Sequence, residues 1–163
     1  MARGVGDRAR TVTSATAPPF VDLHCAGTPE AVRAVLEQVD TALATSGLDT
    51  KTQETCQIVL AEMLNNIVEH AYNGKGQGKI GLELWVAGET LAGRLRDSGR
   101  PLPMGMIPDA GWPKIDPTAP QDWPEGGFGW AIVRELTRDL RYCHDGTSNC
   151  LRFEIDLGQS KTD

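Results

Sequence analysis

The sequence contains no apolar run near the ~18 residues that a membrane-spanning helix needs, so we expect no contact with a membrane. Basic residues are also too few to dominate its charge, because 16 Lys and Arg stand against 22 Asp and Glu. The resulting formal net charge of −6 disfavours direct binding to nucleic acid. The first residues lack the hydrophobic stretch of a secretion signal. These absences predict a cytoplasmic protein.

Cysteine is scarce as well. The four cysteines show no C-x-x-C spacing and no neighbouring pair of histidines; they are Cys25, Cys56, Cys143 and Cys150. A chain of 163 residues, 40% of them hydrophobic, is long enough to bury a core without disulfide bonds. We therefore expect a single domain whose thiols are reduced and mostly buried.

Composition divides the chain into an arm, one folded domain and a short tail. Residues 1–18 lack periodicity and lead into a Pro-Pro pair, which predicts a flexible arm. The folded domain is expected over 19–158, with a tail at 159–163. Within it, the segment 98–126 holds seven of the ten prolines, so we expect no regular element there. A connection this long in a compact domain favours a lid that folds over a ligand or a partner.

The remaining segments show helical or strand periodicity. A first helix is expected from Thr28, whose hydroxyl can cap it, to about Gly47. A second is expected from Asp49 or Thr50 to Tyr72. A third should begin after Gly127. Alternating apolar residues predict a strand at 20–24, a hairpin at 79–96 and a closing hairpin at 140–157. This order predicts an α/β fold, a two-layer sandwich of a mainly antiparallel mixed sheet with helices on one face.

Asp97 is the first residue whose position needs an explanation. The alternation of Leu91, Gly93 and Leu95 aims its carboxylate at the core, where an ion without hydrogen bonds costs several kcal/mol. One interpretation is an Asx turn with Ser98 and Gly99. The other is a bound ligand whose exocyclic amine donates to the carboxylate.

Glu62 and Asn66 form the second feature. At positions i and i+4 they stack on one helix face, where a carboxylate and an amide oxygen can bind Mg²⁺ or a water attached to it. His70 would lie one turn further on. The plainer interpretation is a solvated polar face, with His70 as a structural histidine.

Glycines form the third feature, in the segment 126–129, where they open a helix. Free N–H groups at a helix start, together with close backbone approach, suit a phosphate group. A simple tight turn explains the same residues. The dinucleotide-binding fingerprint does not fit, because no parallel strand precedes them and a third glycine is missing.

These features occur in three motifs that resemble one ATP-binding fold. EMLNNIVEHAY resembles its asparagine box, DSGRPLP its first glycine box and GGFGWAIV its second. The fold is shared by gyrase, Hsp90, histidine kinases and mismatch-repair ATPases, the GHKL group. Residues 20–157 are most similar to its stand-alone branch, the anti-sigma factor serine/threonine kinases. The resemblance thus implies the histidine-kinase-like, or Bergerat, ATPase fold.

The resemblance implies roles for the polar pair on the second helix. Glu62 would be the catalytic residue that orients or deprotonates the attacking hydroxyl group. Asn66 would hold Mg²⁺, and it is chosen over Asn65 because only Asn66 has the required spacing from Glu62.

The other motif residues are implied to contact ATP. Asp97 would bind the adenine amino group, and Gly99 would leave room for the ring. Gly127 and Gly129 would hinge the lid and cradle the phosphates, with His70 near them.

Several positions depart from the family pattern. Pro101 stands where relatives have a second glycine, which stiffens the entrance of the lid. Trp130 replaces a usual leucine. The threonine that often supports the adenine from the last strand has no clear counterpart, and Ser148, Asn149 and Cys150 all remain candidates.

The resemblance also implies activity and partners. The chain would be an anti-sigma factor and a Mg²⁺·ATP-dependent protein serine/threonine kinase. It would bind a sigma factor and phosphorylate a STAS-type anti-sigma factor antagonist. A homodimer is implied too, with an exposed Trp85 or the first helix as the contact. The alternatives are a non-catalytic ATP-binding module that sequesters a regulatory protein, or a histidine-kinase ATPase fragment, disfavoured because no phosphoacceptor-histidine helix is recognised.

Overall fold

A computed structural model describes residues 17–76, 78–109, 111–112 and 127–158 of the chain. Most of the predicted arm, the tail and positions 110 and 113–126 of the predicted lid lie outside the described residues. The regular elements follow in the order β1 (Val21–Ala26), α1 (Pro29–Ala44), α2 (Thr50–Asn66), η1 (Ile67–Ala71), β2 (Lys79–Ala87), β3 (Thr90–Asp97), η2 (Pro103–Gly105), α3 (Gly129–Leu136), β4 (Arg138–His144) and β5 (Asn149–Asp156).

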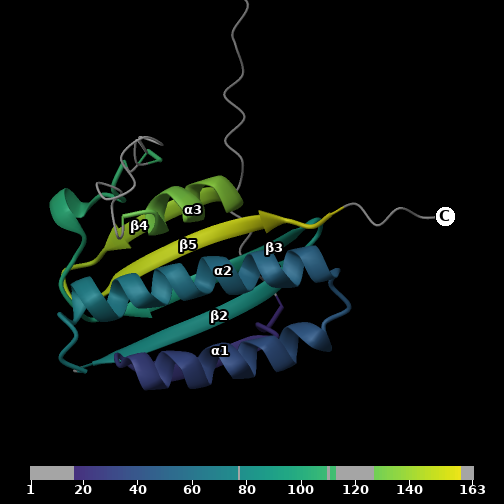
Figure 1. Cartoon of the computed structure of the whole chain (residues 1–163), viewed down its shortest axis with the longest axis horizontal. Coiled ribbons are helices and arrows are strands. Elements are labelled where there is room, and N and C mark those ends of the chain that lie inside the picture. Colours follow the sequence, from purple (N-terminus) through teal and green to yellow (C-terminus); the bar gives the residue numbers. More distant parts are fainter. Residues whose placement is uncertain (1–16, 77, 110, 113–126, 159–163) are drawn as a thin grey trace, which may run out of the picture.

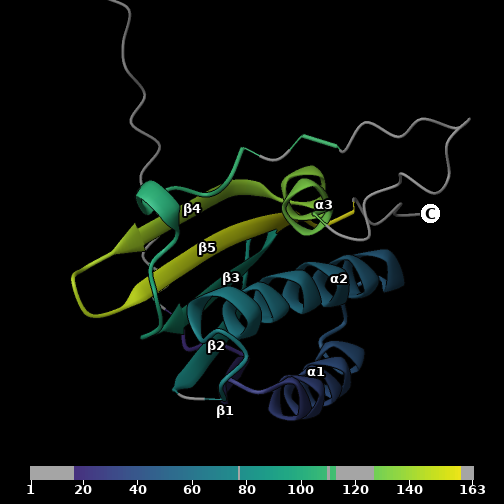
Figure 2. The same ribbon diagram turned by 60° about the vertical axis from the view of Figure 1, so that its left-hand side comes forward.

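The strands form one five-stranded sheet in the order β1-β2-β3-β5-β4, and the four pairings between them are antiparallel. Helices α1, α2 and α3 lie over one face of this sheet (Figures 1 and 2). Apolar side chains of alternate strand positions meet these helices in one core, which includes Leu82, Leu95 and Phe153. This arrangement confirms the predicted two-layer α/β sandwich.

Local sequence signals account for where the first two helices begin. Thr28 caps α1 by accepting a hydrogen bond from the N–H of Ala31 at 3.2 Å, and Pro29 occupies the first turn. Asp49 caps α2 in the same way, accepting from the N–H of Thr52 at 3.0 Å. The buried residues of α1 recur at helical spacing, so this face packs on the sheet and on α2.

The second helix ends differently from the prediction. An α-helix was expected as far as Tyr72, but the helix widens to a π-helical turn at Ile67, directly after Asn66. The N–H of Tyr72 then bonds to the carbonyl of Ile67 at 3.0 Å. Such π turns insert an extra residue and often occur at functional sites. Here the turn carries His70.

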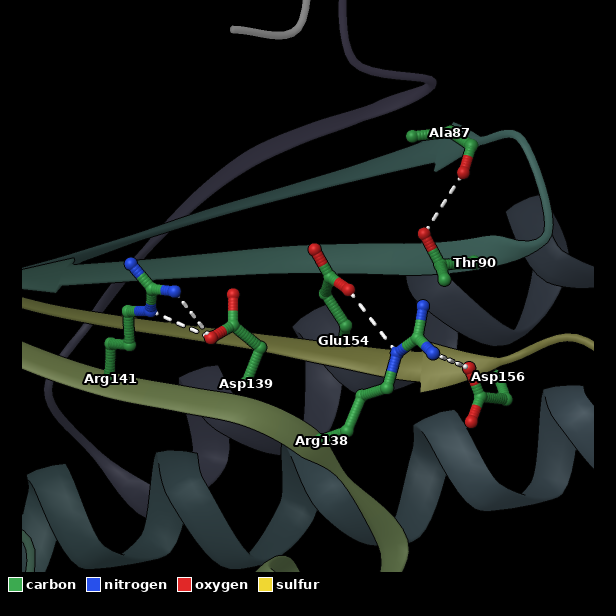
Figure 3. Close-up of polar contacts among 7 residues, drawn as sticks. All are labelled: Ala87, Thr90, Arg138, Asp139, Arg141, Glu154 and Asp156. Atoms are coloured by element: carbon green, nitrogen blue, oxygen red, sulfur yellow. Dashed lines mark hydrogen bonds and ion pairs between the residues drawn. The ribbon is translucent and has the colours of Figure 1, made fainter. Parts of the chain in front are cut away.

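Strand β4 lies at the edge of the sheet and is held partly by side chains. Arg138 pairs with Asp156 of β5 at 2.8 Å and with Glu154 at 3.4 Å, whereas Arg141 pairs with Asp139 on its own strand (Figure 3). The register of β4 against β5 shifts between Arg138 and Arg141, where Asp139 adopts a φ of +50°. This irregularity is a β-bulge, and the pairing is regular beyond it.

Three further expectations need correction. The proline-rich segment was expected to have no regular element, but Pro103–Gly105 forms a short 3₁₀ turn. Trp85 is half-buried rather than exposed, because the guanidinium of Arg94 lies 5.1 Å from the centre of its ring. The thiols are not mostly buried either, because Cys143 is exposed and only Cys56 is fully buried.

Among the described residues, no helix is long and apolar enough to cross a membrane.

Candidate functional site

A cavity of about 400 Å³ opens between the end of α2, the turn η1 and the end of the sheet where β3 meets β5. Its volume is in the usual range for a small-molecule site. Mostly apolar side chains line it, together with a few polar groups. The polar side chains among its lining are those of Asn66, His70, Asn73, Asp97, Arg100, Tyr142 and Asn149.

Asp97 lies at this cavity, as its position in the strand predicts, and is only 7% exposed. Its Oδ1 atom accepts hydrogen bonds from the backbone N–H of Gly99 and from Nδ2 of Asn149, both at 2.8 Å. The bond from Gly99 is the Asx turn that the sequence offered as one interpretation. Both of these bonds use Oδ1, so Oδ2 can accept a hydrogen from a ligand. The turn and a ligand contact are therefore compatible.

The surroundings of Asp97 also set its protonation. Burial raises the pKa of the Asp97 carboxyl above its ordinary value, and the hydrogen bonds from Asn149 and Gly99 oppose this rise, as does the nearby charge of His144. The ionised carboxylate is therefore held at a cost in free energy. A donor that reached Oδ2 would offset part of that cost.

Asn149 is the residue of the last strand that contacts Asp97. It is 3% exposed, and its Nδ2 donates to Asp97 Oδ1 and, at 3.1 Å, to the carbonyl of Gly99. The hydroxyl of Tyr142 donates to Asn149 Oδ1 at 2.6 Å and accepts from the N–H of Leu102 at 3.1 Å. This network joins β3, β4 and β5 to the start of the predicted lid.

The sequence left Ser148, Asn149 and Cys150 as equal candidates, and it missed Tyr142 and Arg100. The pairing of β3 with β5 sets Asn149 directly opposite Asp97. Ser148 instead bonds to Asp145 within the turn. Asn149 could be identified from the sequence only by aligning the predicted hairpin at 79–96 with the predicted hairpin at 140–157, because that strand register places Asn149 opposite Asp97.

Glu62 and Asn66 lie one turn apart on α2, as their spacing predicts, and both face the beginning of α3. A Cβ atom at Gly129 would be 2.6 Å from Oε2 of Glu62 and 3.6 Å from Nδ2 of Asn66. Glycine at position 129 therefore lets the first turn of α3 approach these two side chains. The N–H groups of that turn, which have no partner within the helix, and the two polar side chains thus share one corner of the site.

Asn66 has an unused hydrogen-bonding group. Among the described residues, its Nδ2 is the one buried side-chain nitrogen or oxygen without a partner, and Asn66 lines the cavity. An amide carries a donor and an acceptor, and its oxygen is a suitable ligand for Mg²⁺. Asn65, by contrast, is exposed to solvent. The unpartnered Nδ2 donor fits an acceptor such as a phosphate oxygen beside Asn66, and the amide oxygen would be the atom that could hold Mg²⁺.

The other predicted site residues differ in where they lie relative to the cavity. His70 is exposed and lines the cavity, whereas Gly127 is exposed with a φ of +90° just before α3. A Cβ at Gly99 would lie 2.7 Å from the carbonyl oxygen of Ala71, which itself lines the cavity, and room for the adenine ring at Gly99 stays a prediction. Gly99 is needed so that β3 can end against the turn η1. Residue 126 of the second glycine motif lies outside the described residues.

Comparisons with known proteins agree with this fold. The model of the histidine kinase-like ATPase domain family matches residues 25–155. Blue-light-activated histidine kinase 2 from Erythrobacter litoralis is 28% identical over 130 residues, which cover 77% of this chain and 34% of that relative. The crystal structure of the RsbU and RsbW domains of Rv1364c from Mycobacterium tuberculosis shares the fold, with a TM-score of 0.59 and 20% identity over 86% of this chain and 33% of that one.

The chain spans about a third of the length of both relatives. The family match covers most of the chain, from β1 to β5, and includes every predicted site residue. An ATPase domain implies an ATP site, and the cavity beside Asp97 and Asn66 has the volume and the polar groups for one. The chain belongs to the histidine kinase-like ATPase domain family.

Proposed function

We propose that this chain is a Mg²⁺·ATP-dependent protein serine/threonine kinase and an anti-sigma factor. In this proposal it binds a sigma factor and phosphorylates a STAS-type antagonist of that binding. The proposal rests on the sequence motifs, on the ATPase family and on the geometry of Glu62. In it, Glu62, Asn66, Asp97 and Asn149 each have one task.

Glu62 carries the proposal. It is half-buried, one helical turn from Asn66, and its carboxylate lies against Gly129 at the start of α3. Binding of a nucleotide does not need a carboxylate there, because like charges beside a phosphate weaken binding. A carboxylate that faces the place where phosphates bind is useful for catalysis, since it can take a proton from an attacking hydroxyl group.

The remaining residues would bind and orient the nucleotide. Oδ2 of Asp97 accepts the adenine amino hydrogen, while Asn149 and Gly99 hold the carboxylate in place through Oδ1. Asn66 would hold Mg²⁺ by its amide oxygen, and the N–H groups at the start of α3, next to Glu62 and Asn66, would bind the phosphates. ATP would supply the phosphoryl group, and Mg²⁺ would neutralise part of its negative charge. Phosphoryl transfer depends mainly on such positioning and electrostatic stabilisation.

The described start of the lid supports a protein partner beside the cavity. Met104 is 88% exposed, Met106 57% and Trp112 58%, although all three are apolar. Exposed methionine and aromatic side chains are typical of surfaces that bind other proteins. Arg134 of α3 donates to the carbonyls of Ile107 and Pro108 and so holds this segment near α3. We propose that the antagonist docks here, next to the phosphates.

The metal role of Asn66 gives a first prediction. We expect Asn66→Ala to weaken the binding of Mg²⁺·ATP roughly tenfold, because the metal loses a protein ligand. Binding of ATP in excess EDTA should hardly change. Calorimetry with and without Mg²⁺ measures both. The matched control is Asn65→Ala on the exposed side of the same helix, and equal losses in the two variants would contradict the assignment.

The proposed activity is tested by phosphate transfer. The chain is incubated with Mg²⁺ and ATP labelled on the γ-phosphate, together with each STAS-type protein encoded in the same genome. We expect label on a serine or threonine of one of them, and capture of a sigma factor by the chain. ATP binding without transfer would favour the non-catalytic sequestering module. Acid-labile label on a histidine would favour a histidine-kinase ATPase fragment.

A further inference from the structure

Two cysteines face each other across the last hairpin. In the register of β4 and β5, Cys143 is the direct partner of Cys150. Directly opposed residues of antiparallel strands have Cα atoms about 4.5–5.5 Å apart. Disulfide bonds join residues whose Cα atoms are about 4.4–6.8 Å apart. The backbone therefore already has the spacing that a disulfide between these residues requires.

Both thiols can be reached from solvent. Cys143 is exposed and Cys150 is half-buried. The neighbours Leu151 and Phe153 alternate into the core, so Cys150 points to the face of the sheet without helices. Strand β4 is the edge strand, and the bulge at Asp139 lies at the opposite end of this pairing. An edge strand can adjust to a new cross-link more easily than a central one.

We propose that Cys143 and Cys150 form a redox modification site, at which a small-molecule disulfide oxidises the two thiols to a bridge between β4 and β5. The Cys143 thiolate attacks one sulfur of the small disulfide and releases one thiolate. Cys150, losing its proton to solvent, attacks the sulfur of Cys143 and releases the second thiolate. Two protein thiols are oxidised and one small disulfide is reduced to two thiols.

The protonation of Cys143 sets the conditions for this reaction. Cys143 is exposed, but partial desolvation of its sulfur on the sheet raises the pKa of the thiol, and the adjacent Cys150 raises it further through its charge and a hydrogen bond. Because the thiolate is the attacking form, oxidation should become faster as the pH rises above neutral. Cys56 is a poor competitor, because burial raises its pKa to about 12.

The bridge would act on the cavity from the other side of the sheet. The adjacent residues His144 and Asn149 form the next pair of the ladder, and Nδ1 of His144 lies 3.0 Å from Oδ1 of Asn149. The Cβ atoms of directly opposed residues on antiparallel strands are about 4.5–5.5 Å apart, whereas the two Cβ atoms of a disulfide are about 3.8 Å apart. Formation of the disulfide would therefore draw β4 and β5 together by roughly 1 Å. Binding sites need placement within about 0.5 Å, so this movement should weaken the contact between Asn149 and Asp97.

The test is oxidation of the reduced full chain with excess oxidised glutathione at mildly alkaline pH. We expect the number of free thiols to fall from four to two, with a mass decrease of two hydrogens and no attached glutathione. Peptide mapping without reductant should join Cys143 to Cys150, and dithiothreitol should reverse the link. Stable glutathione on Cys143, a link that involves Cys25, or no reaction would each overturn the proposal.

Serine variants separate the bridge from other oxidation. Cys143→Ser and Cys150→Ser should each keep glutathione on the remaining thiol, whereas Cys25→Ser should form the bridge as the unmodified chain does. The effect on the cavity rests on the proposed function. We expect oxidation to lower ATP affinity several-fold in the unmodified chain but not in the double variant Cys143→Ser/Cys150→Ser.

These outcomes distinguish the two proposals. A reduced chain that binds no ATP contradicts the nucleotide site, while peptide mapping still decides whether the bridge forms. A bridge that forms without any change in ATP affinity overturns its effect on the cavity.

Discussion

Replacing Glu62 by Gln should reduce phosphoryl transfer about a thousandfold, because general-base catalysis by one side chain typically contributes 10²–10⁴-fold. Glutamine has the same shape but cannot accept the proton of the attacking hydroxyl group. Since Glu62 is half-buried beside Gly129, the variant fills the same space at the start of α3. We expect the affinity for Mg²⁺·ATP to stay equal or to rise slightly, since a negative charge near the phosphates is removed. Single-turnover transfer from labelled ATP measures the rate.

A matched control comes from the same helix region. Glu69 is exposed on the turn η1, and Glu69→Gln removes the same charge without touching the beginning of α3. We expect its transfer rate to stay within about twofold of the unmodified chain, since the substitution changes only an exposed side chain. Equal rates for Glu62→Gln and the unmodified chain would show that Glu62 is not the base. Loss of ATP binding in Glu62→Gln would assign Glu62 to binding instead.

Much of the fold could be predicted from local signals. Capping residues and apolar periodicity located α1 and α2, and strand alternation located the hairpin of β2 and β3, together with the inward position of Asp97. The π turn at Ile67 could not be predicted this way. Its residues have the same apolar pattern as an ordinary helix. Contacts that follow the turn come from distant segments, such as the bond from the Tyr72 hydroxyl to the carbonyl of Lys79, and do not show in that pattern.

The candidate site was predictable where one element carries it. Glu62 and Asn66 are on one helix, so their spacing alone predicted that they share a face. Asn149 and Tyr142 could not be selected, because their roles depend on how β5 aligns with β3 and β4. The same limit applies to Cys143 and Cys150. Their separation along the chain resembles no thiol motif, and only the register of the last hairpin brings them together.

Asp97→Asn should lower the affinity for ATP about a hundredfold. The amide oxygen of the variant can still accept from Gly99 and Asn149 in the place of Oδ1. The amide nitrogen then replaces Oδ2 and presents hydrogens to the adenine amino group. Two hydrogen-bond donors then oppose each other, and no hydrogen bond forms between them. Loss of a hydrogen bond to a charged group costs about 1.5–3 kcal/mol, which is roughly 10- to 100-fold in affinity, and the opposed donors add to this loss. Calorimetry with ATP measures the change.

Stability provides the control for correct folding. Burial raises the pKa of Asp97 in the folded chain. The stability that protonated Asp97 contributes is therefore fully present below the ordinary aspartate pKa, and it is lost as the pH rises through the pKa of Asp97 in the folded chain. Asp97→Asn has no such dependence. Its unfolding free energy relative to the unmodified chain should therefore increase between about pH 4 and about pH 7. Urea denaturation at both values measures it, and a variant that is strongly destabilised at neutral pH would contradict this account.

Inosine triphosphate decides whether the lost affinity comes from the adenine contact. Its ring has an oxygen where adenine has the amino group, so the unmodified chain should bind it about 100-fold more weakly than ATP, because oxygen then faces the Asp97 carboxylate. In Asp97→Asn the amide nitrogen can donate to that oxygen. The preference for ATP over inosine triphosphate should therefore shrink at least tenfold or reverse, since one good hydrogen bond is worth about a factor of ten. If both nucleotides lost affinity equally, Asp97 would act on the shape of the cavity and not on the base.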